Sequence, residues 1–129
     1  MAVQLNHTIV ASNDPAGSAG WFAEILGLDE PERFGPFWQI STSNGVNLDF
    51  DRHDTPGKIV PQHYAFLISE KEFDAILGRI VERQISYYAD PAGQRLGEIN
   101  HNDGGRGLYF PDPDGHWLEI ITRPYGSGD

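Results

Sequence analysis

Three side chains that could together hold a divalent metal ion stand in separate strand-like stretches of this sequence. His7 lies in residues 3–10, whose β-branched content and partial alternation predict a strand, and His63 opens a similar stretch. Glu119 stands among large apolar residues, where a buried carboxylate needs a partner. Two imidazoles and one carboxylate form a facial set that binds a divalent ion and leaves positions open for substrate. We therefore expect His7, His63 and Glu119 to be metal ligands.

The most distinctive hairpin pattern in the chain covers residues 108–122 and contains Glu119. A strand ending at Phe110 is followed by a turn rich in Pro and Asp that ends at Gly115, and then by a second strand. Glu119 has apolar neighbours on both faces of that second strand. The pattern predicts a curved sheet with helices outside and a concave pocket that holds Glu119.

The other segments predict two helices and several further strands. A capping side chain before Pro15 begins a helix that ends at Gly27, and Ser69 opens a capping box before a second helix. The expected strands are residues 3–10, 37–42, 46–52, 63–68, 85–89, 97–101, 108–110 and 116–122. The helix residues expected to be buried are Trp21, Phe22, Ile25, Leu26, Phe73, Ile76, Leu77, Ile80 and Val81.

The order of strand, helix and several strands occurs twice, which suggests an internal duplication. Residues 44–50 and 114–120 align turn with turn, and His7 and His63 each lie in the first strand of a half. The matched pairs are Gly45 with Gly115, Leu48 with Leu118, and Asp49 with Glu119. The sequence therefore predicts an α+β fold of two βαβββ modules that form a cup-like mixed sheet with helices on its outer face.

We expect one domain over residues 1–129. Module one covers 1–55 and module two 59–125, with residues 55–58 as the linker. Residues 126–129 are a tail, and the chain is expected to fray from Pro124 onward.

Composition narrows the possible chemistry and partners. There are no cysteines, so a metal site must be built from His, Asp and Glu. A net charge of −10 with only nine Lys and Arg residues argues against nucleic-acid binding. No apolar run reaches the roughly 18 residues of a membrane span, and the N-terminus lacks a signal-peptide pattern. We expect a cytoplasmic protein that does not contact membranes.

Over nearly its whole length, the chain resembles the vicinal oxygen chelate superfamily. This superfamily includes glyoxalase I, type I extradiol dioxygenases, fosfomycin-resistance enzymes and bleomycin-resistance proteins. The turn Asp-Pro-Asp-Gly-His-x-x-Glu, which ends at Glu119, is the most specific part of the resemblance. The resemblance implies two βαβββ modules, with metal ligands at the positions of His7, His63 and Glu119.

The resemblance extends to three further candidates. His101 and Tyr109 resemble the closing segment of extradiol dioxygenases, in which a His and a Tyr hydrogen-bond the catecholate. Tyr109 would then donate to a substrate oxygen, and His101 or Asp49 would transfer protons. Asp49 also matches the place of a fourth, carboxylate ligand in glyoxalase I.

Three functions are compatible with these residues. We favour a metal-dependent enzyme whose small substrate chelates the metal through neighbouring oxygens, and within that class a ring-cleaving extradiol dioxygenase. A glyoxalase-like lyase or isomerase is the first alternative. The second is a bleomycin-resistance-type protein that binds a cationic drug without catalysis; the acidic charge and Trp21, Trp38 and Trp117 are compatible with it. The metal is Fe(II), Mn, Ni, Zn or Co, and we expect a homodimer whose modules pair within or between chains.

Overall fold

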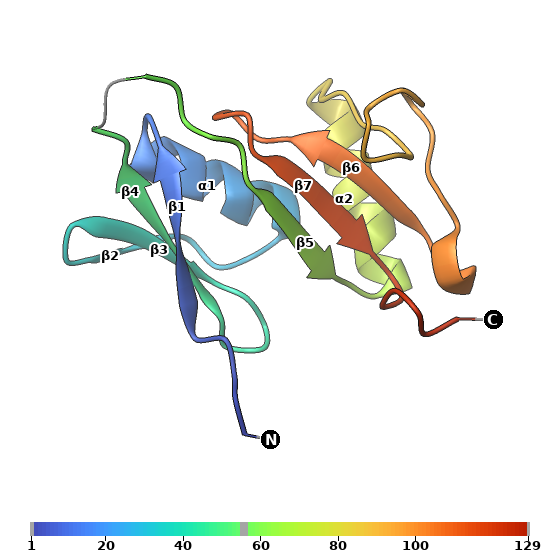
Figure 1. Cartoon of the computed structure of the whole chain (residues 1–129), viewed down its shortest axis with the longest axis horizontal. Helices are drawn as coiled ribbons and strands as arrows, with labels where there is room; N and C mark the ends of the chain where they lie inside the picture. Colours follow the sequence, from blue (N-terminus) through green and yellow to red (C-terminus); the bar gives the residue numbers. More distant parts are fainter. Residues whose placement is uncertain (1, 55–56, 129) are drawn as a thin grey trace. The chain divides into compact units, whose positions relative to one another are not determined.

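The computed structural model describes residues 2–54 and 57–128, which divide into two compact units, Met1–Ile59 and Val60–Asp129. The predicted linker, residues 55–58, begins with two residues that lie outside the described ranges. Unit one contains β1 (His7–Ser12), α1 (Pro15–Leu26), β2 (Glu32–Phe34), β3 (Phe37–Ser41) and β4 (Asn47–Arg52). Unit two contains β5 (His63–Leu67), α2 (Glu70–Glu82), the short 3₁₀ turn η1 (Asn102–Gly104), β6 (Gly107–Pro111) and β7 (Trp117–Ile121). Figure 1 shows both units in sequence colours.

Unit one is a four-stranded sheet in the order β1-β4-β3-β2. β1 pairs with β4 in parallel, and the other two pairs are antiparallel. The Asp14 side chain accepts a hydrogen bond from Gly17 N at the start of α1, and Gly27 ends the helix in the left-handed conformation. The predicted bounds of α1 are therefore confirmed, while β1 begins only at His7.

Unit two is a three-stranded sheet in the order β5-β7-β6, with β5 and β7 parallel. The Ser69 side chain accepts from Glu72 N and caps α2, as expected. The strands predicted at 85–89 and 97–101 are reduced to isolated bridges at Tyr88 and Asn100. Tyr88 still bridges to Tyr109 on β6 and so occupies the outer place that β2 fills in unit one. Two small mixed sheets with one helix each confirm the predicted α+β fold of two modules.

Strand register confirms the internal duplication residue by residue. Asp49 stands between Gln39 and Ile9 in unit one, as Glu119 stands between Tyr109 and Ala65 in unit two. His7 and His63 each lie two residues before the β1 or β5 partner of these carboxylates. Gly45 and Gly115 occupy the same position in their hairpin turns, with positive φ angles of 80° and 89°. The histidine and carboxylate positions therefore match in the two modules.

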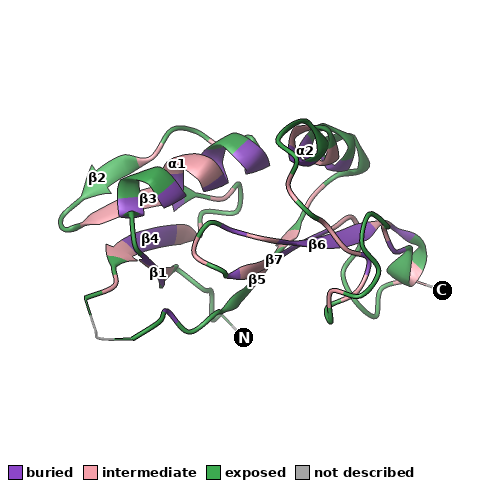
Figure 2. Ribbon diagram, turned by 90° about the horizontal axis from the view of Figure 1, so that it is seen from above, coloured by how far each residue is buried: buried purple, intermediate pink, exposed green. Residues whose placement is uncertain are grey.

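Each sheet buries one face against its own helix (Figure 2). In unit one, Phe22 of α1 packs edge-on against Phe50 of β4, with ring centroids 4.9 Å apart. In unit two, Phe73, Ile76 and Ile80 are the buried residues of α2. The fully buried apolar residues of β6 and β7 are Leu108, Phe110, Leu118 and Ile120.

Three burial predictions were wrong. Trp21 and Leu77 are only half-buried, and Val81 is 55% exposed. Consecutive helix residues point about 100° apart, so Phe22 and Ile80 take the positions facing the sheet and their neighbours cannot. Among the helices of the described ranges, none is long and apolar enough to cross a membrane.

Candidate metal centre

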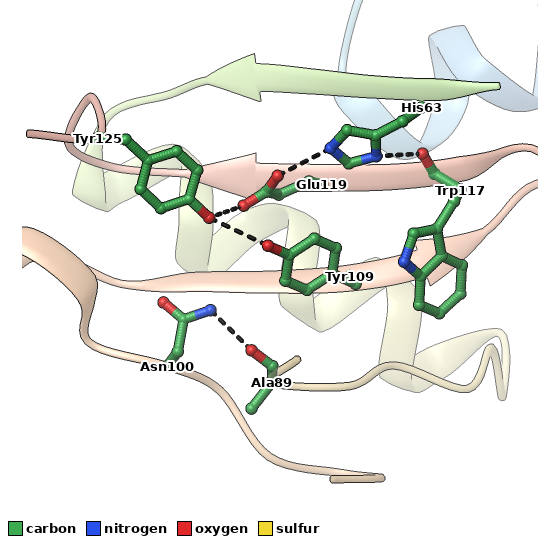
Figure 3. A network of polar contacts seen from close by, with 7 residues as sticks. All are labelled: His63, Ala89, Asn100, Tyr109, Trp117, Glu119 and Tyr125. Carbon is green, nitrogen blue, oxygen red and sulfur yellow. Dashed lines mark hydrogen bonds and ion pairs between the residues drawn. The ribbon is translucent and has the colours of Figure 1, made fainter. Parts of the chain in front are cut away.

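A group of polar and aromatic side chains lies on the face of the unit-two sheet opposite α2. Partners in the β5-β7-β6 register point to the same side, so His63 and Trp117 share a face with Glu119 and Tyr109. Glu119 is 1% exposed and lies at the centre of a network of polar contacts (Figure 3). The other face of the same strands packs into the apolar core, so strand alternation alone separates the site from the core.

The ring of His63 is held so that one nitrogen faces Glu119. Nδ1 lies 2.9 Å from the carbonyl oxygen of Trp117, which can only accept, so Nδ1 carries a proton and donates it. Nε2 lies 3.0 Å from Oε1 of Glu119. In a neutral imidazole with Nδ1 protonated, Nε2 presents a lone pair to a carboxylate oxygen that also presents lone pairs. A proton on Nε2 or a cation beside both atoms is needed to make this pair favourable.

The second carboxylate oxygen of Glu119 belongs to a pair of tyrosines. The Tyr125 hydroxyl donates a short hydrogen bond to Oε2, and the Tyr109 and Tyr125 oxygens are 3.1 Å apart. Since the Tyr125 proton is used on Glu119, Tyr109 donates to Tyr125. Burial, and then the hydrogen bond to Tyr125, raises the pKa of Tyr109. Partial burial, and then the bond to Glu119, raises the pKa of Tyr125, so both hydroxyls are protonated donors at neutral pH.

An aromatic surface adjoins these polar groups. Tyr109 stacks on Trp117 with centroids 6.1 Å apart and 16° between the ring planes, and the His63 ring is 6.0 Å from Tyr109, with 27° between their planes. Tyr88 extends the group, 5.5 Å from Trp117. Stacked rings of this kind offer a flat apolar surface next to a polar centre, which suits a planar substrate.

The corresponding face of unit one carries His7 and Asp49. Asp49 is 3% exposed, and its Oδ1 accepts a 2.7 Å hydrogen bond from Nε2 of Gln39. His7 is exposed at the first residue of β1, with Nδ1 2.8 Å from the side-chain oxygen of Asn6. The expectation that His7 sits in mid-strand was wrong, because the paired residues of β1 and β4 begin at His7 and Asn47, and Asn6 adds only its carbonyl oxygen.

The described residues bring only part of the predicted ligand set together. His63 and Glu119 are in contact, whereas His7 belongs to the other unit, and its meeting with them remains a prediction. Within residues 2–54 and 57–128, no three His, Asp or Glu side chains form a group that could hold a metal. His101 is exposed beside η1 and is absent from the polar network drawn around Glu119 in Figure 3.

Sequence reasoning missed Tyr125, which lies in the segment expected to fray. Gly126 N and Gly128 N each donate to Oδ1 of Asp103, at 3.1 Å and 3.2 Å, so the described part of this tail is held in place. The only signal in the sequence was a tyrosine six residues after Glu119. Because Gly126 and Gly128 follow it near the end of the chain, the sequence favoured a frayed end.

Comparison with known proteins defines the class to which this fold and site belong. Residues 4–120 match the Glyoxalase/Bleomycin resistance protein/Dioxygenase superfamily, which is the predicted resemblance. The chain belongs to this superfamily.

Individual relatives lie within the same class. Oxidase ChaP-H2 is 59% identical, with a TM-score of 0.95 and all of both chains covered. Oxidase ChaP-H1 is 57% identical, with a TM-score of 0.93, and the match covers 97% of this chain and 99% of that one. Glutathione transferase FosA from Serratia marcescens is 29% identical over 93% of this chain and 81% of its own length.

Proposed function

We propose that this protein is a divalent-metal-dependent oxidase whose small substrate chelates the metal through neighbouring oxygens. The observation that carries the proposal is the pairing of His63 Nε2 with Glu119 Oε1 at 3.0 Å, with Nδ1 already committed to a carbonyl. A backbone carbonyl on one imidazole nitrogen is the usual way to orient the other nitrogen toward a metal. When Nε2 carries no proton, its lone pair and the carboxylate oxygen together fit a divalent cation.

In this proposal His7 completes the ligand set with His63 and Glu119. A bound divalent ion would act as a Lewis acid toward the chelating substrate oxygens and, if it is iron, would activate dioxygen. Tyr109 would turn its hydroxyl from Tyr125 to a substrate oxygen and steady the negative charge that develops there. Asp49 or His101 would move the substrate proton, with Asp49 favoured because it is buried on the face of its sheet that carries His7.

Two observations support an oxidation as the reaction. The ChaP relatives, which share more than half of their residues with this chain, are described as oxidases. The stacked surface of Tyr109 and Trp117 beside Glu119 suits an aromatic ring. We propose ring cleavage of an aromatic diol as the specific reaction, in which both atoms of dioxygen enter the product and no external reductant is consumed.

The first experiment is metal analysis of protein purified anaerobically without chelator, comparing wild type with His7→Ala. We expect near-stoichiometric metal in wild type and loss in the variant, and an iron-loaded protein should then cleave a catechol in the presence of dioxygen. Absence of metal from wild type, even after anaerobic reconstitution, would contradict the proposal.

Subunit mixing tests the proposed homodimer and whether its ligands come from one chain or two. Neither His7→Ala nor Glu119→Ala homodimers should hold metal. If the site forms between chains, exchanged subunits of the two variants should regain about a quarter of the wild-type metal, because half of the dimers are mixed and each has one intact site. If the site forms within a chain, mixing should restore none.

A glyoxalase-like lyase or isomerase is the second candidate. Asp49 favours it, since this carboxylate is 3% exposed at the position that matches Glu119 and could serve as a fourth ligand. Iron with catechol cleavage supports the oxidase, whereas nickel or zinc with thiohemiacetal isomerisation supports the lyase.

A non-catalytic protein that binds a cationic ligand is the third candidate. A hollow of about 590 Å³ in unit one is lined by residues that include Glu24, Glu30 and Trp38, which suit a cation. In that case Glu119→Ala should leave ligand binding unchanged.

A further inference from the structure

Backbone amides of the C-terminal segment bind the side chain of Asp103. Residues 123–128, here called the strap, follow β7, and two of their amides donate to Oδ1 of Asp103. Within the strap, the Arg123 guanidinium donates to the Ser127 carbonyl at 3.0 Å. A Cβ at Gly128 would overlap the backbone of Asp103, so the close approach requires glycine there. These contacts give the strap a defined path.

That path delivers one side chain to the candidate metal ligand. Tyr125 is 52% exposed, yet its hydroxyl reaches Glu119, which is 1% exposed (Figure 3). Tyr109 supports the same hydroxyl from β6. The two carboxylate oxygens are thereby distinguished, because Oε1 faces His63 and Oε2 accepts from Tyr125.

We propose that Tyr125 is a positioning residue of the metal centre and that the strap, anchored on Asp103, is the device that places it. The inference rests on the proposed function and adds to it a residue outside the three ligands. The Tyr125 hydroxyl binds Oε2 of Glu119, so only Oε1 is left next to Nε2 of His63 to bind a metal. The same hydrogen bond fixes the orientation of the carboxylate before the metal binds. Hydrogen bonds that orient metal ligands typically change metal affinity by about 10–100-fold.

Two substitutions test the Tyr125 hydroxyl and the Asp103 anchor of the strap separately. Tyr125→Phe removes the donor and keeps the ring. Asp103→Gly removes the acceptor of both strap amides without backbone strain, because Asp103 has a positive φ of 57°. Asp103→Asn retains a side-chain oxygen that can accept, and Tyr87→Phe is a matched loss of a hydroxyl outside this network.

The test is titration of the metal-free full-length chain with cobalt(II), followed by the visible absorption of the bound ion. We expect Tyr125→Phe and Asp103→Gly to weaken cobalt(II) binding by about tenfold or more and to shift the absorption bands. Asp103→Asn and Tyr87→Phe should stay within roughly twofold of wild type. Hydrogen exchange in the absence of metal should show the amides of Gly126 and Gly128 protected in wild type and Tyr125→Phe, and unprotected in Asp103→Gly.

The outcomes separate this inference from the function on which it rests. If wild type binds no cobalt(II), the proposed function fails and the role of Tyr125 fails with it. If wild type binds and Tyr125→Phe binds with the same affinity and spectrum, only the inference is overturned. It is also overturned if Tyr125→Phe unprotects the strap amides as fully as Asp103→Gly, because the tyrosine would then serve to fix the tail.

Discussion

Glu119→Gln offers a clean separation of metal binding from folding. Gln has nearly the volume of Glu, its amide oxygen can accept from Tyr125, and its NH₂ group can donate to Nε2 of His63. Both polar contacts of this 1% exposed side chain can therefore be kept in the metal-free protein. We expect the free energy of unfolding without metal to change by less than about 1 kcal/mol. The negative charge that a divalent ion needs is lost, so metal binding should fall by at least a hundredfold.

The size of the effect can be worked out for a thermal shift assay. At a metal concentration about 100 times Kd, binding stabilises the folded protein by about 2.7 kcal/mol. A chain of 129 residues gains about 4 °C in Tm per kcal/mol, so wild type should melt about 10 °C higher with metal than without. Because its Kd is at least a hundredfold higher, Glu119→Gln should show a shift of about 2 °C or less at the same concentration. A metal-induced shift equal to that of wild type would refute the assignment of Glu119 as a ligand.

Three further predictions concern stability. Phe73→Ala should cost about 3–5 kcal/mol in chemical unfolding, because the ring is fully buried between α2 and its sheet; a loss below about 1 kcal/mol would contradict this packing. Ser69→Ala should cost about 1 kcal/mol in the same assay by removing the cap of α2, whereas Ser69→Asp should keep it. A hydrogen bond from Thr122 and pairing with Arg106 hold the pKa of Glu70 below its ordinary value of 4.5. The ionised Glu70 side chain therefore stabilises the folded protein above pH 4.5, and this stabilisation is lost as the pH falls through the lower pKa of the folded state. Glu70→Gln should therefore flatten the acid limb of a plot of Tm against pH, and an unchanged limb would show that the pair is not coupled to folding.

Local sequence was sufficient to predict those helices and turns whose ends are marked by a capping residue or a turn glycine. The caps at Asp14 and Ser69 and the glycine turns at Gly45 and Gly115 begin or end elements close to where they were predicted. Such signals work because capping and positive φ depend on one or two residues and not on distant packing. The strand predicted at 85–89 shrank to a bridge at Tyr88, because pairing requires a neighbouring strand that local alternation cannot supply.

Some residues of the candidate site could likewise be predicted from the sequence, whereas their contacts depend on the tertiary structure. His63 and Glu119 could be named from the sequence, because a polar residue inside an apolar strand is unusual and the duplicated pattern matches their positions with His7 and Asp49. Strand pairing then brings His63 and Glu119 into contact. The proposed third ligand, His7, lies in the other compact unit, and no local pattern encodes whether it meets His63 and Glu119.

The sequence by itself determined the module type, the two turns and the residue types of the proposed metal ligands, since each depends on short-range chemistry. Only the tertiary structure decided that the C-terminal strap reaches the site. Tyr125 meets Glu119 because the chain turns back after β7 and two of its amides bind Asp103, more than twenty residues earlier. The close approach at Gly128 and the left-handed backbone of Asp103 make that docking possible, and neither can be recognised before the two segments are seen together.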